Sequence, residues 1–335
     1  MAARSPLPPA AGPLTSELFE HLRQAPHSLP QLPPLDGDPF EDDHQLALYA
    51  CYELGYRGWH DADDEWEWET TLIALRLELE HRFERAVLDG LAGVPDPPGG
   101  GVAERLNAAI EQDESPSVAQ FLAARGSREQ VRELLVHRSL YGLKEADPHA
   151  RAIQRLAGDA KSALLEILAD EYGAGRPERL HSRLYRQTMD EFGLDGTENA
   201  HIGRIPGVTL ATINLMSLFG SHARWSAALV GHFALTEMTS SAANRGYARA
   251  VSRVEPENRR AVDYFEEHVE ADAVHDIVAA HDLAGGLAKA EPELADRIIF
   301  GARALMFVEG RFARHVLGAW QDGRSSLRMS AEPAS

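Results

Sequence analysis

The chain has 335 residues, a single cysteine and a formal net charge of −19 at pH 7. This acidity argues against a nucleic-acid partner, because nucleic acids attract clustered lysine and arginine. A single cysteine excludes an internal disulfide framework and fits a reducing compartment, so we expect a cytoplasmic protein. No window approaches the roughly 18 consecutive apolar residues typical of a membrane span, so we expect no membrane partner.

Helical periodicity recurs along the chain, whereas alternating strand patterns are nearly absent. Segments rich in Pro and Gly at 25–40 and 94–101 interrupt the helical periodicity. The second segment predicts a boundary between an N-terminal helical region and the main body. We therefore expect accessory helices with Pro-rich linkers in residues 1–100, a main helical body in 101–321 and a disordered tail in 322–335. The helices predicted after the boundary span 102–113, 117–125, 129–142, 148–172, 177–192, 207–219, 222–252, 258–285 and 293–320.

The segment 164–181 carries the first pair of candidate ligands, Glu171 and His181. In one continuous helix these side chains would lie about 15 Å apart. Gly173, Gly175 and Pro177 stand between them and can interrupt the helix, which would shorten that distance. An ordinary helix end followed by a new helix would explain the same glycines and proline.

Glu237 is a third candidate, because it lies in an otherwise apolar helical segment. A buried carboxylate costs several kcal/mol unless it is paired or bound to a metal. A salt bridge to an arginine from a neighbouring helix is the alternative. We interpret His232, in the same segment, as a core histidine.

The segment "HVEADAVH" adds His268, Asp272 and His275. Each residue of an α-helix advances about 100°, so these three side chains lie on one narrow stripe. Two histidines and a carboxylate on one rigid face suit a metal ion. A solvated acidic helix face would show the same spacing.

Together, "ADEYGAGRPERLH", the Glu of "ALTEM" and "HVEADAVH" resemble the ligand segments of the haem-oxygenase-like di-iron oxidases and oxygenases. The resemblance covers about residues 130–320 and implies an all-α, haem-oxygenase-like helical bundle with an additional N-terminal helical region. It also implies a set of metal ligands, with Glu145 of "YGLKEADPHARAI" in the position of a further ligand that several members have. The implied ligands are Glu145, Glu171, His181, Glu237, His268, Asp272 and His275.

A protein of this kind would bind two Fe(II) ions and use O2 to oxidise a C–H bond or a nitrogen of a small carboxylate-bearing substrate, an amino acid or a fatty acid. A buried arginine would suit the carboxylate. Arg224 and Arg245 are the candidates, although an ordinary surface or ion-pair role is the more common one for each. The expected partners are the small-molecule substrate, a second copy in a homodimer, and a reductase or iron–sulfur protein as external electron donor.

Three alternatives remain open from the sequence. A ferritin-like di-iron protein would use Glu178 with His181, in the carboxylate-x-x-His spacing of that class. A cofactor-free or haem-binding relative on the same fold would leave Glu237 and Asp272 unexplained. A non-enzymatic helical binding module would not explain a carboxylate in an apolar helix.

Overall fold

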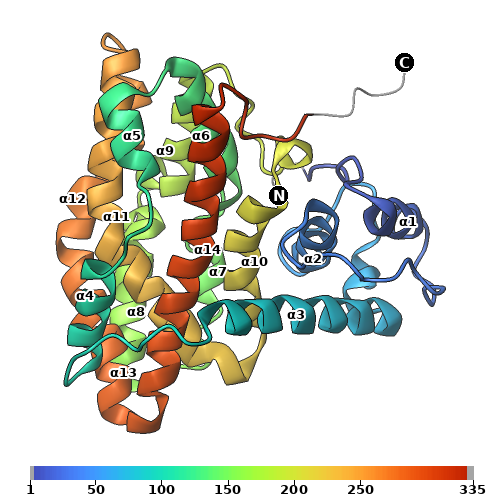
Figure 1. Cartoon of the computed structure of the whole chain (residues 1–335), viewed down its shortest axis with the longest axis horizontal. Helices are drawn as coiled ribbons and strands as arrows, with labels where there is room; N and C mark the ends of the chain where they lie inside the picture. Colours follow the sequence, from blue (N-terminus) through green and yellow to red (C-terminus); the bar gives the residue numbers. More distant parts are fainter. Residues whose placement is uncertain (1–3, 330–335) are drawn as a thin grey trace.

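The computed structural model describes residues 4–329, apart from the side chains of residues 270–274. Within that range the chain forms helices and loops and no β-strand, which confirms the all-α class. Figure 1 shows an upright helical bundle with three N-terminal helices beside it. These three are α1 (Pro13–Leu22), α2 (Asp42–Leu54) and α3 (Thr70–Leu91). The bundle contains α4 (Val102–Glu111), α5 (Val118–Arg125), α6 (Arg128–Gly142), α7 (Asp147–Ala150), α8 (Gly158–Glu171), α9 (His181–Glu191), α10 (Gly207–Ser221), α11 (Ser226–Val254), α12 (Asp263–Ile277), α13 (Gly285–Ala290) and α14 (Ala295–Gln321).

Two glycines allow the long helices α11 and α14 to pack closely in the bundle (Figure 1). A Cβ on Gly231 of α11 would lie 1.7 Å from the carbonyl oxygen of Ile298 in α14. A Cβ on Gly301 of α14 would lie 1.9 Å from the carbonyl oxygen of Ala228 in α11. The two backbones therefore touch where both helices lack a side chain.

Three of the predicted helices are interrupted or change type in the structure. The helix predicted over 148–172 is broken, because α7 ends at Ala150 and α8 begins at Gly158, whose φ of +56° favours glycine. The segment 177–192 begins as one 3₁₀ turn, Pro177–Arg179, before α9 starts at His181. The segment 258–285 ends its α-helix at Ile277 and continues as a π-helix over Val278–Ala284.

The N-terminal helices share their apolar core with the bundle. Helix α2 packs against α10, and α3 packs against α14. Buried side chains form one cluster from Leu7 to Leu327. Residues 322–329 belong to the tail that the sequence predicts to be disordered, and within them Ser326 and Leu327 are buried. The rest of that predicted tail, 330–335, lies outside the described residues. Among the described residues, none of the helices has the length and apolarity needed to cross a membrane.

Candidate metal centre

The break between α8 and α9 brings Glu171 and His181 together. Gly173, Ala174 and Gly175 all have positive φ angles, of 75°, 49° and 79°. A Cβ on Gly173 would lie 2.9 Å from the backbone nitrogen of Leu180, so the returning chain requires a glycine there. As a result, Nδ1 of His181 lies 3.0 Å from Oε2 of Glu171, instead of the separation that a continuous helix would impose.

Glu171, His181 and His268 form the first of two buried ligand groups. One ligand atom from each residue lies within 4.8 Å of those of the other two. The rings of His181 and His268 are 4.3 Å apart between centroids. Nδ1 of His268 donates a hydrogen bond to the carbonyl oxygen of Tyr264 (2.8 Å), which fixes the ring and leaves Nε2 as its ligand atom.

Glu171, Glu237 and His275 form the second group, again with ligand atoms within 4.8 Å of one another. Nε2 of His275 donates to the carboxylate of Asp170 at 3.0 Å, so Nδ1 is the nitrogen that faces the group. That Nδ1 lies 3.4 Å from Oε2 of Glu237. At this distance both atoms could act as ligands of one metal ion.

Asp170 is a functional candidate that the sequence analysis missed. Carboxylates commonly orient a metal-binding histidine through its second ring nitrogen, which is the contact that Asp170 makes with His275. Its position directly before Glu171 was the available signal, but the partner lies 105 residues away along the chain.

The electrostatics keep Glu171 suited to binding a cation. Burial opposes ionisation of its carboxyl group, but the hydrogen bond from His181 and the nearby charges of His181, His268 and His275 outweigh this effect. The pKa of Glu171 therefore lies below its ordinary value. A buried set of imidazoles and carboxylates, with one carboxylate common to two groups, fits a pair of iron ions.

Two of the seven predicted ligands are not in these groups. Glu145 lies in the turn after α6, is 2 % exposed and has a φ of 47°. Its charge contributes to the raised pKa values of Tyr185 and Tyr264, where burial is the larger cause, so it lies near the same buried region. The side chain of Asp272 lies outside the described residues. Both assignments remain predictions.

The geometry bears on two of the alternatives from the sequence. Glu178, the carboxylate required by the ferritin-like alternative, is exposed, whereas Glu171 is buried. Oε2 of Glu237 lies beside Nδ1 of His275, which is itself a candidate ligand. His232 is buried and contacts His149 at 3.2 Å, as expected for a core histidine.

A cavity of about 370 Å³ adjoins the ligand groups, and Glu171, Glu237 and His268 form part of its wall. Arg224 and Arg245, the arginines considered from the sequence, do not line it. Arg224 pairs with Glu84, and Arg245 is exposed beside Ser241. Of the described residues in the cavity wall, Arg138 alone carries a fixed positive charge.

Residues 132–310 match the family model described as iron-containing redox enzyme. This match spans more than half of the chain. The chain belongs to this family. Its class is therefore that of an oxidoreductase and its implied cofactor is iron, and the helical bundle is haem-oxygenase-like.

A sequence match to a curated enzyme is consistent with this family assignment. The chain is 25% identical over 237 residues to a nitrosourea synthase from Streptomyces achromogenes subsp. streptozoticus. The aligned region covers 69% of this chain and 49% of the synthase, so the chain spans about half the length of the curated relative it matches.

Proposed function

We propose that this iron-containing redox enzyme is a non-haem di-iron oxidase or oxygenase that uses O2 to oxidise a small carboxylate-bearing substrate. The observation that carries the proposal is the membership of Glu171 in both buried ligand groups. One carboxylate common to two groups suits two neighbouring metal ions better than one. The similarity to a nitrosourea synthase supports an oxidative reaction but not a particular substrate.

The protein's own residues would hold the metal and exclude water. Glu171, His181 and His268 would bind one iron, and Glu171, Glu237 and His275 the other. A pair of Fe(II) ions supplies electrons to O2 and the oxidising power for attack on a C–H bond or a nitrogen. All five side chains are buried, so substrate in the cavity would meet the metals in a site with little bulk water.

The substrate would bind in the cavity beside these ligands. The described wall combines apolar side chains such as Met216 and Leu235 with hydroxyl groups of α11 and with Arg138. This composition is typical of a small-molecule site, in which a few polar groups orient a largely enclosed ligand. Arg138 takes the role of carboxylate partner that the sequence analysis considered for Arg224 and Arg245.

Anaerobic titration with Fe(II), followed by measurement of bound iron, tests the proposal. We expect about two ions per chain and O2 consumption that a substrate panel stimulates. A chain that binds no iron at saturating Fe(II) would overturn the proposal. Binding of one ion would indicate a mononuclear site with two histidines and one carboxylate instead.

A further inference from the structure

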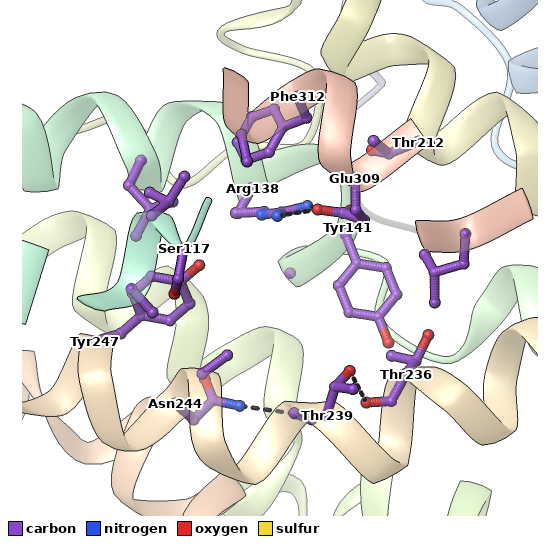
Figure 2. A pocket seen from close by; sticks show the side chains of 18 of the residues that line it. Ser117, Arg138, Tyr141, Thr212, Thr236, Thr239, Asn244, Tyr247, Glu309 and Phe312 are labelled. Carbon is purple, nitrogen blue, oxygen red and sulfur yellow. Dashed lines mark hydrogen bonds and ion pairs between the residues drawn. The ribbon is translucent and has the colours of Figure 1, made fainter. Parts of the chain in front are cut away.

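Arg138 and Glu309 form an ion pair in the cavity wall that the proposed metal chemistry does not use. Nη1 and Nη2 of Arg138, on α6, donate to the two carboxylate oxygens of Glu309, on α14, at 2.7 and 2.6 Å. The guanidinium also lies over the ring of Phe312, 4.3 Å from its centroid. Figure 2 shows the pair on one side of the cavity, with Thr236, Thr239 and Asn244 of α11 on the other.

Both charges are accessible from the cavity. The side chains of Arg138 and Glu309 are 26% and 31% exposed, and both line the cavity. Burial opposes the charge on Arg138, but Glu309 outweighs it and raises the pKa of Arg138 above its ordinary value. The paired contact occupies only two N–H groups of the guanidinium and leaves lone pairs on both oxygens of Glu309.

Stability alone gives little reason for this pair. An enclosed ion pair stabilises a fold weakly, because the loss of hydration offsets the attraction between the charges. Apolar side chains of similar size would fill the same space. A pair of opposite charges facing a cavity is, however, complementary to a ligand that carries two oppositely charged groups close together.

We propose that Arg138 and Glu309 together bind the head group of a zwitterionic substrate, an α-amino acid, with its carboxylate against Arg138 and its ammonium against Glu309. A fatty acid would bring a second negative charge to Arg138, whose charge Glu309 already balances, and would offer no ammonium group to Glu309, so the pair selects against it. The inference rests on the proposed function in one respect, which is that this cavity is the substrate site.

The rest of the substrate would extend along an aromatic wall toward the candidate metal ligands. The rings of Tyr185 and Tyr264 lie 4.8 Å apart, and the ring of Tyr264 lies 4.3 Å from that of His268. Both tyrosines line the cavity, as do Arg138 and His268. The same cavity wall therefore offers charges for the head group and candidate ligands of the proposed reaction centre.

Equilibrium binding tests the inference without turnover. Two samples of the full chain are used, one metal-free and one loaded anaerobically with Fe(II). Each is titrated calorimetrically with a panel of L-amino acids. The tightest ligand is then compared with its des-amino carboxylic acid and its decarboxylated amine. We expect both analogues to bind at least about tenfold more weakly than the amino acid.

Two variants test which residue binds the carboxylate and which binds the ammonium group. Glu309→Gln should weaken binding of the amino acid about tenfold or more and leave its des-amino analogue unaffected or bound more tightly. Arg138→Gln should weaken both ligands. The matched control is Glu84→Gln, because Glu84 makes the same paired contact with Arg224, at 2.7 and 2.6 Å, outside the cavity. Circular dichroism and melting curves confirm that each variant is folded.

Three results would overturn the inference: no amino acid binds, the des-amino acid binds as tightly as the amino acid, or folded Glu309→Gln binds like the Glu84→Gln control. Iron binding is measured on the same samples. A chain that binds two iron ions without preferring zwitterions would refute only the head-group assignment. A chain that prefers zwitterions but binds no iron would refute only the di-iron function.

Discussion

At the scale of single residues, Glu171 differs from the other candidate ligands because it belongs to both groups. His181 belongs only to the first group. We therefore expect Glu171→Ala to reduce bound iron from about two ions to near zero, and His181→Gln to reduce it to about one. Anaerobic Fe(II) loading with a chelator assay measures both.

Glu178→Ala is the control for Glu171→Ala, because Glu178 is exposed and seven positions further along the chain. It should retain the iron content of the unmodified protein. If Glu178→Ala lost more iron than Glu171→Ala, the ferritin-like alternative would be favoured instead.

His44 makes the free energy of unfolding depend on pH, at a position far along the chain from the candidate metal ligands. Burial lowers its pKa from 6.5 to about 4, and its Nε2 donates to the carbonyl oxygen of Leu79. Between pH 6.5 and 4 the unfolded chain binds a proton at this position and the folded chain does not. The free energy of unfolding therefore falls as the pH falls, by about 3 kcal/mol from this group over pH 7 to 4.

His44→Gln should remove that contribution, so its free energy of unfolding should depend less steeply on pH. Urea unfolding at several pH values measures the slope. His81→Gln, at an exposed position of α3, is the control and should keep the original slope. A slope for His44→Gln equal to that of the control would show that folding does not lower the pKa of His44.

At the scale of helices, the contact between α11 and α14 depends on the absence of side chains. Gly301→Ala would place a Cβ 1.9 Å from the carbonyl oxygen of Ala228, so the two backbones must separate. We expect a loss of about 1–3 kcal/mol of stability, as for other overpacked contacts. Chemical denaturation measures the change.

Gly318→Ala is the matched control, because Gly318 lies on the same helix with no atom within 4 Å of an added Cβ. This variant should gain up to about 1 kcal/mol, the usual preference of a helix for alanine over glycine. Equal effects of the two substitutions would contradict the argument from close packing.

The break between α8 and α9 shows how helix ends determine the candidate site. Three successive positive φ angles turn the chain so that the first residue of α9, His181, returns to the last residue of α8, Glu171. The sequence signals a break through its glycines and proline. The close approach of Gly173 to Leu180, which leaves no room for a Cβ, appears only in the folded chain.

At the scale of the whole molecule, the N-terminal helices reach the turn that carries Glu145. Lys144, 4 % exposed, pairs with Glu53 of α2 and lies 2.9 Å from the hydroxyl of Tyr49. The hydroxyl of Tyr49 donates in turn to Asn199 at 2.6 Å. Through α2, the N-terminal region thus holds the residue next to a predicted metal ligand.

Lys144→Met should destabilise the protein by about 3–5 kcal/mol, because it leaves the charge of Glu53 buried without its partner. The double variant Lys144→Met, Glu53→Leu should recover much of that loss, since it removes both charges. Denaturant unfolding of the two single variants and the double variant gives the coupling energy. Additive losses would mean that the pair does not connect α2 to the bundle.

The sequence alone was sufficient for the properties that depend on local spacing. Helical periodicity predicted the all-α class, and the order of Glu, His and Asp residues indicated the resemblance to an iron-containing family. Position along one helix also placed His268 and His275 on a common face. These features follow from the fixed geometry of the α-helix, which relates neighbours in the chain whatever the rest of the molecule does.

Only the tertiary structure showed which distant residues meet. Arg138 and Glu309 are 171 positions apart, and Asp170 and His275 are 105 apart. Many arginines and aspartates in the sequence have the same chemistry, and Arg224 and Arg245 were reasonable candidates for the cavity. Helix packing decides between them, because the contact of α11 with α14 and the turn before α9 determine which charged groups become buried.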